Sequence, residues 1–546
     1  MLPPFRLLPV STRVSVVVAV FNPGPSFEEL VASLLRQTLP PEDFEVWFCD
    51  DGSEPETIGR LEALHAEHPH LKVLLLPHTG WPGTPRNAGL DAATGTYVFF
   101  ADHDDHFGDD ALRTMVDHAD AWGSDVLVPR LTRVGRRPSM RMFARNVPDA
   151  KLGTDPLLEY LTPHKLFRTT LLREHGIRFP DGRVRLEDHL LVTRAYFAAR
   201  VVSILADYPC YYWTVRKDRP SASVGRLDPV GYFGALARVL DVVEANTEPG
   251  DLRDRLLSHW YAGKVLDRVG THFMVNYPDD YRAHLLDVLE PFVAERFPAR
   301  LDRYVPFPKR VRSALLRAGR RDDLLRLAAV DRTTRATAHA TALEWDDQGG
   351  LLVTAEASLS IAGEPARYVP GPEGTLLWEP PLALPADVVT PEVLDAAPDV
   401  ATDSMVVLVR DRADSTDAWL PDEVHERLPG APLRVRARLD PRTARLGRRL
   451  GRRSELGVDG SRAGWPFTVI LRVSDEVLAA AGPPRQVGGR VFALGRARHG
   501  QVQLTATKAP KPPPPPPPAP PTPTWRRVVR GVRRRLRRLP AGRSRG

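Results

Sequence analysis

The segment Phe44–Ser53 has the sequence FEVWFCDDGS, in which a mostly apolar run leads directly into two carboxylates and a glycine. Tyr97–Asp105 (YVFFADHDD) repeats this pattern, and Val14–Phe21 (VSVVVAVF) is another apolar run of similar length. Apolar runs of this kind predict parallel strands buried on both faces. Carboxylates at the carboxyl ends of such strands lie where open α/β sheets bind ligands. The sequence therefore predicts an enzyme with an α/β fold.

Four composition changes divide the chain. Residues 1–225 alternate strand and helix signals, which predicts an open, mainly parallel sheet covered by helices. Ser53 and Glu56 form a capping-box pattern for the helix after the second strand. Residues 226–333 show helical periodicity and predict a helical subdomain. Residues 334–507 contain short β runs between Pro- and Gly-rich loops, typical of an immunoglobulin-like β-sandwich region of one or two modules.

The end of the chain has a different chemistry. Residues 508–524 include seven consecutive prolines and predict a stiff polyproline spacer. Residues 525–546 contain ten arginines and no acidic residue. Their charge of +10 exceeds the net charge of +7 of the whole chain, so the rest of the chain is net acidic. Apolar residues in this tail recur at helical spacing, which favours an amphipathic helix on an anionic membrane surface. A solubilising tail and a nonspecific nucleic-acid patch are the alternatives.

The two cysteines indicate a reducing compartment. Cys49 and Cys210 are too few for a disulfide framework and lie in apolar surroundings, so buried thiols are expected. No secretory signal is visible, and the run Val14–Phe21 is far too short to span a bilayer. We therefore expect a cytoplasmic protein that is peripheral at the inner face of the membrane.

Six motifs in the first domain resemble family 2 of the nucleotide-sugar-dependent glycosyltransferases. In order, they are Val16–Asn22 (VVVAVFN), Ser33–Thr38 (SLLRQT), Asp50–Ser53 (DDGS), Gly83–Gly89 (GTPRNAG), Asp102–Asp105 (DHDD) and Glu187–Asp188 (ED). Their order and spacing match over about 200 residues. The resemblance implies the GT-A fold, an inverting mechanism and a UDP-sugar donor.

The resemblance assigns the donor-binding side chains. It implies that Asp51 accepts the imide hydrogen of uracil, with Phe21 and Asn22 walling the same pocket. A carboxylate suits this role because uracil N3–H needs an acceptor. The resemblance also places Arg86 and Asn87 beside the nucleotide, at a helix start that favours phosphate. A helix-capping aspartate and a solvated helix end are the structural alternatives.

A divalent cation is expected at the DHDD motif. Mn²⁺ or Mg²⁺ held by hard oxygen ligands would neutralise the diphosphate leaving group. The resemblance implies that Asp104 ligates the metal and that Asp102 contacts the ribose or reaches the metal through water. His103 either faces the donor or fills the middle position of the motif.

The catalytic base is expected in the Glu187–Asp188 motif. The resemblance implies that Asp188 takes the proton from the acceptor hydroxyl and that Glu187 shapes the acceptor pocket. It also places His164 and Lys165 on the acceptor side, although His164 is equally suited to a packed or capping role. In the polar stretch after Trp213 we expect a loop that closes over the diphosphate, through Arg216, Arg219 and Ser221.

Two positions depart from the family pattern. The proline usual in the first strand motif is Ala19 here, which is a mild change in a buried backbone. Many members also supply a metal-binding histidine downstream of the base, and none occurs between Tyr211 and Ser223. Water and phosphate would then complete the metal shell, or the loop replaces part of that role.

The whole architecture resembles enzymes that decorate wall teichoic acids and related cell-wall glycopolymers. The implied reaction is metal-dependent transfer of a hexosyl or N-acetylhexosaminyl group to a hydroxyl of a cell-surface glycan or polyol-phosphate polymer. In such relatives the β-sandwich region promotes oligomerisation, often as trimers; a glycan-binding or purely structural sandwich is the alternative. A nucleic-acid partner is not expected, because the basic charge is confined to the tail.

Two other functions were weighed against this one. The first is a catalytically inactive membrane-associated scaffold that oligomerises through its sandwich, which the intact DHDD and ED motifs disfavour. The second is a chain-extending polysaccharide synthase, which usually carries transmembrane helices or a QxxRW motif that is not found here.

Overall fold

The computed structural model describes residues 12–134, 142–214, 226–412, 417–420, 422–426, 432–444 and 449–509. The described residues up to Thr507 belong to one compact unit, separate from the segment that begins at Lys508. Nearly all of the proline-rich spacer and the whole arginine-rich tail lie outside the described residues, so their roles stay predictions. Within the described ranges, no helix combines the length and apolar character needed to cross a membrane.

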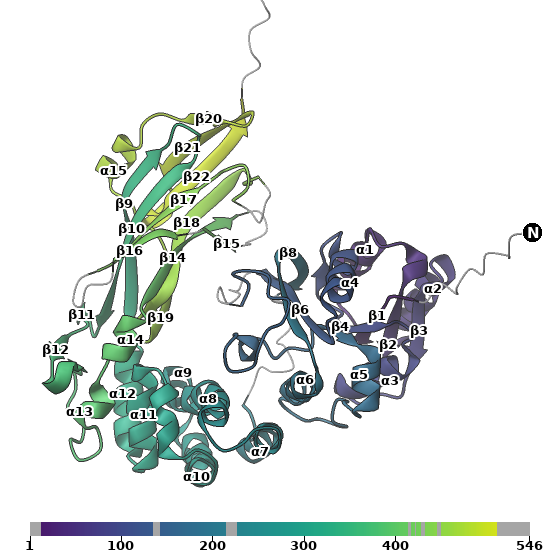
Figure 1. Cartoon of the computed structure of the whole chain (residues 1–546), viewed down its shortest axis with the longest axis horizontal. Coiled ribbons are helices and arrows are strands. Elements are labelled where there is room, and N and C mark those ends of the chain that lie inside the picture. The colour runs from purple at the N-terminus through teal and green to yellow at the C-terminus, as the bar shows by residue number, and fades with distance from the viewer. Residues whose placement is uncertain are drawn as a thin grey trace, which may run out of the picture. The chain divides into compact units, whose positions relative to one another are not determined.

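An eight-stranded sheet forms the first domain, with the strand order β3-β2-β1-β4-β7-β6-β8-β5 (Figure 1). Its strands are β1 (Val14–Val20), β2 (Phe44–Asp50), β3 (Leu71–Leu75), β4 (Tyr97–Asp102), β5 (His106–Phe107), β6 (Val126–Val134), β7 (Leu166–Arg168) and β8 (Val202–Thr214). Strands β1 to β4 pair in parallel, whereas β7 is antiparallel to both β4 and β6. The predicted open α/β sheet is confirmed, and its second half is mixed rather than parallel.

Helices cover the sheet and connect its strands. They are α1 (Ser26–Leu35), α2 (Pro55–Glu67), α3 (Gly83–Ala92), α4 (Ala111–Trp122), α5 (Thr169–Glu174) and α6 (Glu187–Ala198), with single 3-10 turns at Pro41–Asp43 and Leu157–Glu159. Helix α3 lies directly against β1 and β2, since a Cβ at Gly89 would clash with Val17 and lie 2.8 Å from Cys49 Sγ. Both cysteines are buried free thiols, as expected.

The strand order changes direction beside β1, which places the site. Strand β1 pairs with β2 on one side and with β4 on the other, so Val20 is in register with Asp50 and Ala19 with Asp102. Ligands of open α/β sheets bind at such a reversal, outside the carboxyl ends of the strands. The DDGS and DHDD motifs therefore flank one crevice edge.

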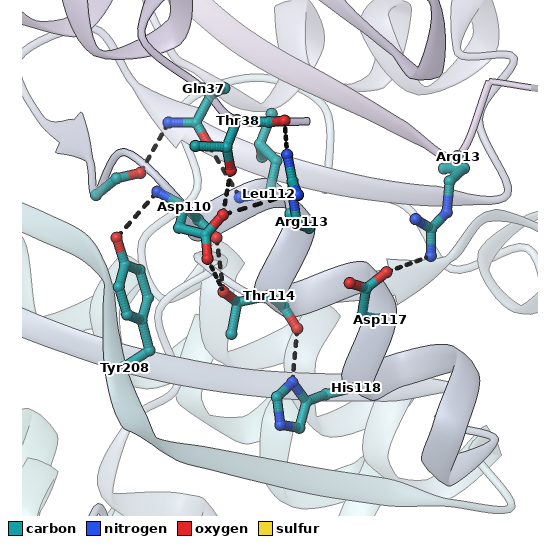
Figure 2. A network of polar contacts seen from close by, with 11 residues as sticks. Arg13, Gln37, Thr38, Asp110, Leu112, Arg113, Thr114, Asp117, His118 and Tyr208 are labelled. Atoms are coloured by element: carbon teal, nitrogen blue, oxygen red, sulfur yellow. Dashed lines mark hydrogen bonds and ion pairs between the residues drawn. The ribbon is translucent and has the colours of Figure 1, made fainter. Parts of the chain in front are cut away.

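A polar network fixes the segment that follows the DHDD motif (Figure 2). The Gln37 side-chain amide donates to the carbonyls of Ser33 and Gly108, and its oxygen accepts from the backbone N–H of Leu112. The Tyr208 hydroxyl accepts from the backbone N–H of Asp110 at 2.9 Å. These hydrogen bonds hold β5 and the start of α4 in place, and so fix the position of the residues that follow the turn between β4 and β5.

Residues 229–331 are helical. The elements are α7 (Pro229–Ala245), α8 (Asp251–Trp260), a π-helical turn (Tyr261–Val265), a 3-10 turn (Leu266–Val269), α9 (Thr271–Asn276), α10 (Asp279–Arg296), a 3-10 helix (Ala299–Tyr304), α11 (Phe307–Arg317) and α12 (Arg321–Asp331). Asp228 caps α7 by accepting from the backbone N–H of Gly231. A buried ion pair between Arg312 and Asp331 joins α11 to α12.

Two antiparallel sheets follow and share one core. The five-stranded sheet contains β9 (Arg335–Trp345), β10 (Leu351–Ile361), β11 (Glu364–Pro365), β16 (Asp422–Glu426) and β17 (Leu433–Leu439). The seven-stranded sheet contains β14 (Ser404–Asp411), β15 (Asp417–Trp419), β18 (Arg453–Arg462), β19 (Trp465–Ile470), β20 (Arg485–Val487), β21 (Arg490–Arg496) and β22 (Val502–Lys508). Alternate side chains of β10 and β17 are buried, as in a sheet with one covered face. Most buried side chains of the two sheets form one hydrophobic cluster, whereas Leu359, Ile361 and Trp465 pack with the cluster of the first domain and the helices.

Short elements complete this region. They are the hairpin β12 (Tyr368–Pro370) and β13 (Leu376–Trp378), the helices α13 (Pro391–Leu394), α14 (Ala397–Ala401) and α15 (Asp475–Ala480), and 3-10 turns at Pro372–Gly374 and Arg498–Gly500.

Candidate active site

Arg86 is a buried arginine that joins the predicted donor side to the predicted base. It lies in the first turn of α3, and its Nη2 donates to Asp102 Oδ1 at 2.7 Å while its Nη1 donates to Asp188 Oδ1 at 3.2 Å. Burial opposes the charged form, but the nearby charges of Asp102 and Asp188 outweigh it and raise the pKa of Arg86. One cation thus holds the end of β4 and the start of α6 together.

Asp188, the predicted general base, is a carboxylate with a raised pKa. Burial and the neighbouring charge of Glu187 raise its pKa to about 8, against the opposing charge of Arg86. The pKa of Glu187 is raised as well, mainly by burial. The Asp188 side chain is still 28% exposed, so an acceptor hydroxyl can reach it. A base works best when its pKa lies near the operating pH.

Lys165 is a fully buried lysine near this pair. Its ammonium donates to the Thr162 carbonyl oxygen at 2.6 Å. Burial lowers the pKa of Lys165 to about 7, and the charge of Asp188 acts in the opposite direction. Lys165 is therefore buried near the predicted base and is not part of an open acceptor surface.

The other predicted acceptor-side residue, His164, lies against the donor side. Its Nε2 is 3.6 Å from Asp102 Oδ2, and its Nδ1 is 3.2 Å from the Phe100 carbonyl oxygen. A carbonyl can only accept, so Nδ1 carries the proton and the Nε2 lone pair points toward Asp102. Burial lowers the pKa of His164 to about 4, which keeps the ring neutral.

The four side chains of the DHDD turn make different contacts. Asp102 faces Arg86, and the charge of Arg86 lowers the pKa of Asp102 although burial opposes this. The His103 ring bonds the Ala19 carbonyl oxygen on β1 at 3.1 Å. Asp105 is buried and accepts from the backbone N–H of Thr214 at 2.8 Å. Asp104, the predicted metal ligand, is half-buried between His103 and Asp105.

A group of side chains that could hold a metal forms beside this turn, but with a different composition from that predicted. Asp102, Asp105 and His164 each offer a ligand atom within 4.8 Å of the others. The second oxygen of Asp105 is buried and has no hydrogen-bond partner among the described residues. Burial and the charges of Asp102 and Asp104 raise the pKa of Asp105 well above its usual range. A bound cation would relieve this repulsion, so the donor set fits a divalent ion.

Tyr211 is a site residue that the sequence analysis did not assign. It lies on β8, and its hydroxyl accepts from the backbone N–H of Asp102 at 2.9 Å. Its ring stacks on His164 with a centroid distance of 4.7 Å. Tyr211 therefore orients two members of the Asp102, Asp105 and His164 group. Its position in a run of aromatic residues gave no signal for this role.

The predicted uracil pocket surrounds Asp51. Its Oδ1 accepts from the backbone N–H and the hydroxyl of Thr79, and its Oδ2 accepts from the backbone N–H of Gly80. Phe21 is 42% exposed and stacks on His78 at a centroid distance of 4.4 Å. An exposed aromatic face beside a buried carboxylate is suited to a planar base.

Two asparagines predicted to line the nucleotide site are engaged with the backbone. Asn22 has a φ of 40°, and its side-chain oxygen accepts from the backbone N–H of Glu54 at 2.8 Å. Asn87 donates to the Phe179 carbonyl oxygen and accepts from the Phe179 N–H, both at 3.0 Å. Asn87 thereby fixes the segment that leads to Asp188.

The capping-box prediction for Ser53 was wrong. Helix α2 begins at Pro55, with Glu54 at its N-cap and no side-chain cap. The Ser53 hydroxyl instead accepts from the backbone N–H of Asn22 at 2.9 Å. A proline is favoured at the first helical position, so the start moves past the serine.

The predicted diphosphate loop lies outside the described residues. Arg216, Arg219 and Ser221 fall within 215–225, and their assignment stays a prediction.

Family models match two parts of the chain. Residues 15–186 match the Glycosyl transferase family 2 model, and residues 229–328 match the Glycosyl transferase TarS linker domain. The first match contains the crevice edge described above, as far as Leu186.

Characterised relatives match the same part of the chain. A poly(ribitol-phosphate) β-glucosyltransferase of Bacillus spizizenii is 31% identical over 236 residues, which cover 43% of this chain and 37% of the relative. The poly(ribitol-phosphate) β-N-acetylglucosaminyltransferase TarS of Staphylococcus aureus is 31% identical over 251 residues, covering 45% of this chain and 43% of TarS. The matched segments thus span about two fifths of each relative.

A solved structure agrees with this match. The chain is similar to S. aureus TarS 1–349 in complex with UDP, with a TM-score of 0.51 and 26% identity. This similarity covers 65% of the present chain and 98% of the solved one. Residues 15–186 therefore form a family 2 glycosyltransferase domain with the GT-A fold, followed by a TarS-type linker domain, in a chain that resembles the poly(ribitol-phosphate) glycosyltransferases.

Proposed function

We propose that the chain is an inverting glycosyltransferase that transfers a sugar from a UDP-sugar to a hydroxyl of a polyol-phosphate polymer. The observation that carries this proposal is the bridge from Asp102 through Arg86 to Asp188. Through this bridge the Arg86 side chain alone connects Asp102, at the predicted donor site, to Asp188, whose pKa is about 8. The relatives named for poly(ribitol-phosphate) transfer support the acceptor class.

We assign a residue to each step of the proposed reaction. Asp188 accepts the proton of the acceptor hydroxyl, whose oxygen forms a bond to the anomeric carbon as the bond to UDP breaks. Arg86 holds Asp188 in place and keeps positive charge beside the departing diphosphate. Asp51 and Phe21 bind the uracil ring on the other side of β1. Uracil recognition and proton transfer are thus assigned to opposite sides of β1.

A divalent cation is part of this proposal. Asp102, Asp105 and His164 would hold it, with Asp104 as a further carboxylate on the same turn. When bound, Mn²⁺ or Mg²⁺ would neutralise charge on the diphosphate leaving group. His164 would thereby take the place of the metal-binding histidine that is absent between Tyr211 and Ser223.

The cation site has a direct test in metal binding. We expect His164→Ala and Asp105→Asn each to weaken Mn²⁺ binding by roughly tenfold or more, as loss of a ligand or an orienting partner does. Titration of the full chain with Mn²⁺, followed by electron paramagnetic resonance, measures this without turnover. Asp110→Asn, on the same side of the sheet but outside the group, is the control. Unchanged Mn²⁺ affinity in both variants would exclude His164 and Asp105 as ligands.

The proposed activity is tested by UDP release. We expect the full chain to release UDP from one of a panel of UDP-sugars when poly(ribitol phosphate) is present, and to lose this activity in EDTA. Product analysis should show the sugar on the polymer with inverted anomeric configuration. A chain that neither binds nor turns over any UDP-sugar would instead be the non-catalytic scaffold.

The remaining proposals concern the cell. We propose that the enzyme works at the inner face of the membrane, where residues 525–546 would contact anionic lipid. We also propose that residues 334–507 promote self-association, and the shared core of their two sheets supports a stable module for this purpose.

A further inference from the structure

Two arginines just ahead of the predicted base lie over the ring of one tryptophan. The guanidinium carbons of Arg183 and Arg185 each lie 5.6 Å from the centre of the Trp81 ring. Trp81 itself is only 7% exposed, whereas Arg183 is exposed and Arg185 half-buried. A guanidinium stacked on an aromatic ring keeps its N–H edge available for other partners.

The segment that carries these arginines is anchored at both ends. At its start, Phe179 exchanges two backbone hydrogen bonds with the Asn87 side chain. Pro180 lies so close to α3 that a Cβ at Gly83 would be 2.9 Å from the Pro180 carbonyl oxygen. At its end, Leu186 has a left-handed φ of 58° and leads directly into α6. The two arginines are thus presented from a fixed segment.

We call Arg183 and Arg185 the arginine pair, and Trp81 its platform. In the sequence, the pair lies just before the predicted base and the platform lies just before α3. Arg185 is three residues before Asp188, and its charge acts on the neighbouring Glu187. Trp81 lies two residues before α3, which carries Arg86.

Neither member of the pair is neutralised by the protein. In the described part of the chain, no carboxylate oxygen lies within 4.0 Å of either guanidinium, whereas Arg178 in the same segment is bidentate to Asp91. Two arginines that lie over one aromatic ring, neither of them in an ion pair among the described residues, are suited to an external anion.

We propose that Arg183 and Arg185, held on Trp81, bind a phosphodiester group of the acceptor polymer and so direct a neighbouring hydroxyl to Asp188. This inference rests on the proposed function and names the part of the substrate that the site recognises. The planar fork of arginine matches phosphate oxygens in a bidentate way. The acceptor is favoured over the donor diphosphate because both arginines lie within five residues of Asp188 in the sequence. Trp81, in contrast, follows Gly80, which donates to Asp51 on the donor side, so the test must separate the two phosphates.

The test separates the two sources of phosphate. We expect the double variant Arg183→Gln/Arg185→Gln to raise KM for poly(ribitol phosphate) by about tenfold or more, since hydrogen bonds to charged groups are individually strong. The KM for the UDP-sugar and kcat at saturating polymer should stay within about twofold. The salt dependence of kcat/KM for the polymer should weaken, because two screened charges are gone. A rise in KM for the UDP-sugar alone would overturn the proposal.

A second readout does not depend on turnover. Fluorescently labelled poly(ribitol phosphate) should bind the wild-type chain about tenfold more tightly than the double variant. The matched control is Arg255→Gln, which removes an arginine that also lies over a ring, 5.4 Å from Tyr304, but is paired with Asp251. Equal binding by wild type and double variant, or no binding by wild type, overturns the arginine assignment. Absence of UDP release from every donor refutes the proposed function instead.

Discussion

Replacement of Asp188 by asparagine is expected to lower kcat for sugar transfer by about 10²- to 10⁴-fold, the usual contribution of a positioned base. Asparagine keeps the shape of the side chain and can still accept from Arg86, so UDP-sugar binding should be retained. Initial rates at saturating donor and polymer, together with donor affinity from calorimetry, measure the two effects separately. Asp181→Asn, which removes an exposed carboxylate from the same segment, should leave both unchanged.

The pH profile gives this experiment its specific signature. The folded chain holds the pKa of Asp188 at about 8, so the base is protonated below that pH and ionised above it. For the wild-type chain, kcat/KM should therefore rise with pH and level off above about 8. The residual rate of Asp188→Asn should lack this rise. The same acidic limb in both proteins would show that another group is the base.

Replacement of Arg86 by methionine is expected to destabilise the first domain by roughly 3–5 kcal/mol, the cost of leaving buried charge without its partner. Methionine fills a similar volume but leaves Asp102 and Asp188 without their shared cation. The shift of the urea midpoint at constant slope measures the loss. The deficit should be larger at pH 9 than at pH 6, because Asp188 ionises between these values.

An exposed arginine provides the matched comparison for Arg86. Arg36 also bridges two carboxylates, Glu29 and Asp109, but its side chain is 46% exposed. Surface ion pairs contribute about 0–1 kcal/mol, so Arg36→Met should shift the urea midpoint only slightly. Equal shifts in the two variants would mean that the buried bridge carries no special stability.

The first half of the sheet was predictable because its signals are local. Val14–Val20, Phe44–Asp50 and Tyr97–Asp102 are short apolar runs that end in polar residues, and each forms a parallel strand at the site. The second half depends on distant pairing. Strand β7 lies antiparallel between β4 and β6. It consists of only three residues, Leu166–Arg168, which have no marked sequence pattern, so its place in the sheet could not be predicted from the sequence.

The same insertion explains the location of His164. Leu166 is in register with Phe99, and the strands run in opposite directions, so the residues before Leu166 continue alongside the end of β4. His164 therefore lies beside Asp102, although its place in the sequence is 62 residues away. Asp105 and Tyr211 were missed for a related reason, since their contact depends on β8 reaching the same strand end.

The close approach of Gly89 to β1 has a consequence for anyone redesigning the donor preference of this enzyme. Gly89 cannot be replaced by a larger residue, because any side chain there would push α3 away from the sheet and displace Arg86 with it. The exposed side chains of Phe21 and His78 lie on the predicted uracil side, and the His78 ring bonds the Asp51 carbonyl oxygen, so changes there would alter recognition of the base. Libraries for a new sugar should therefore leave both Gly89 and these two positions untouched.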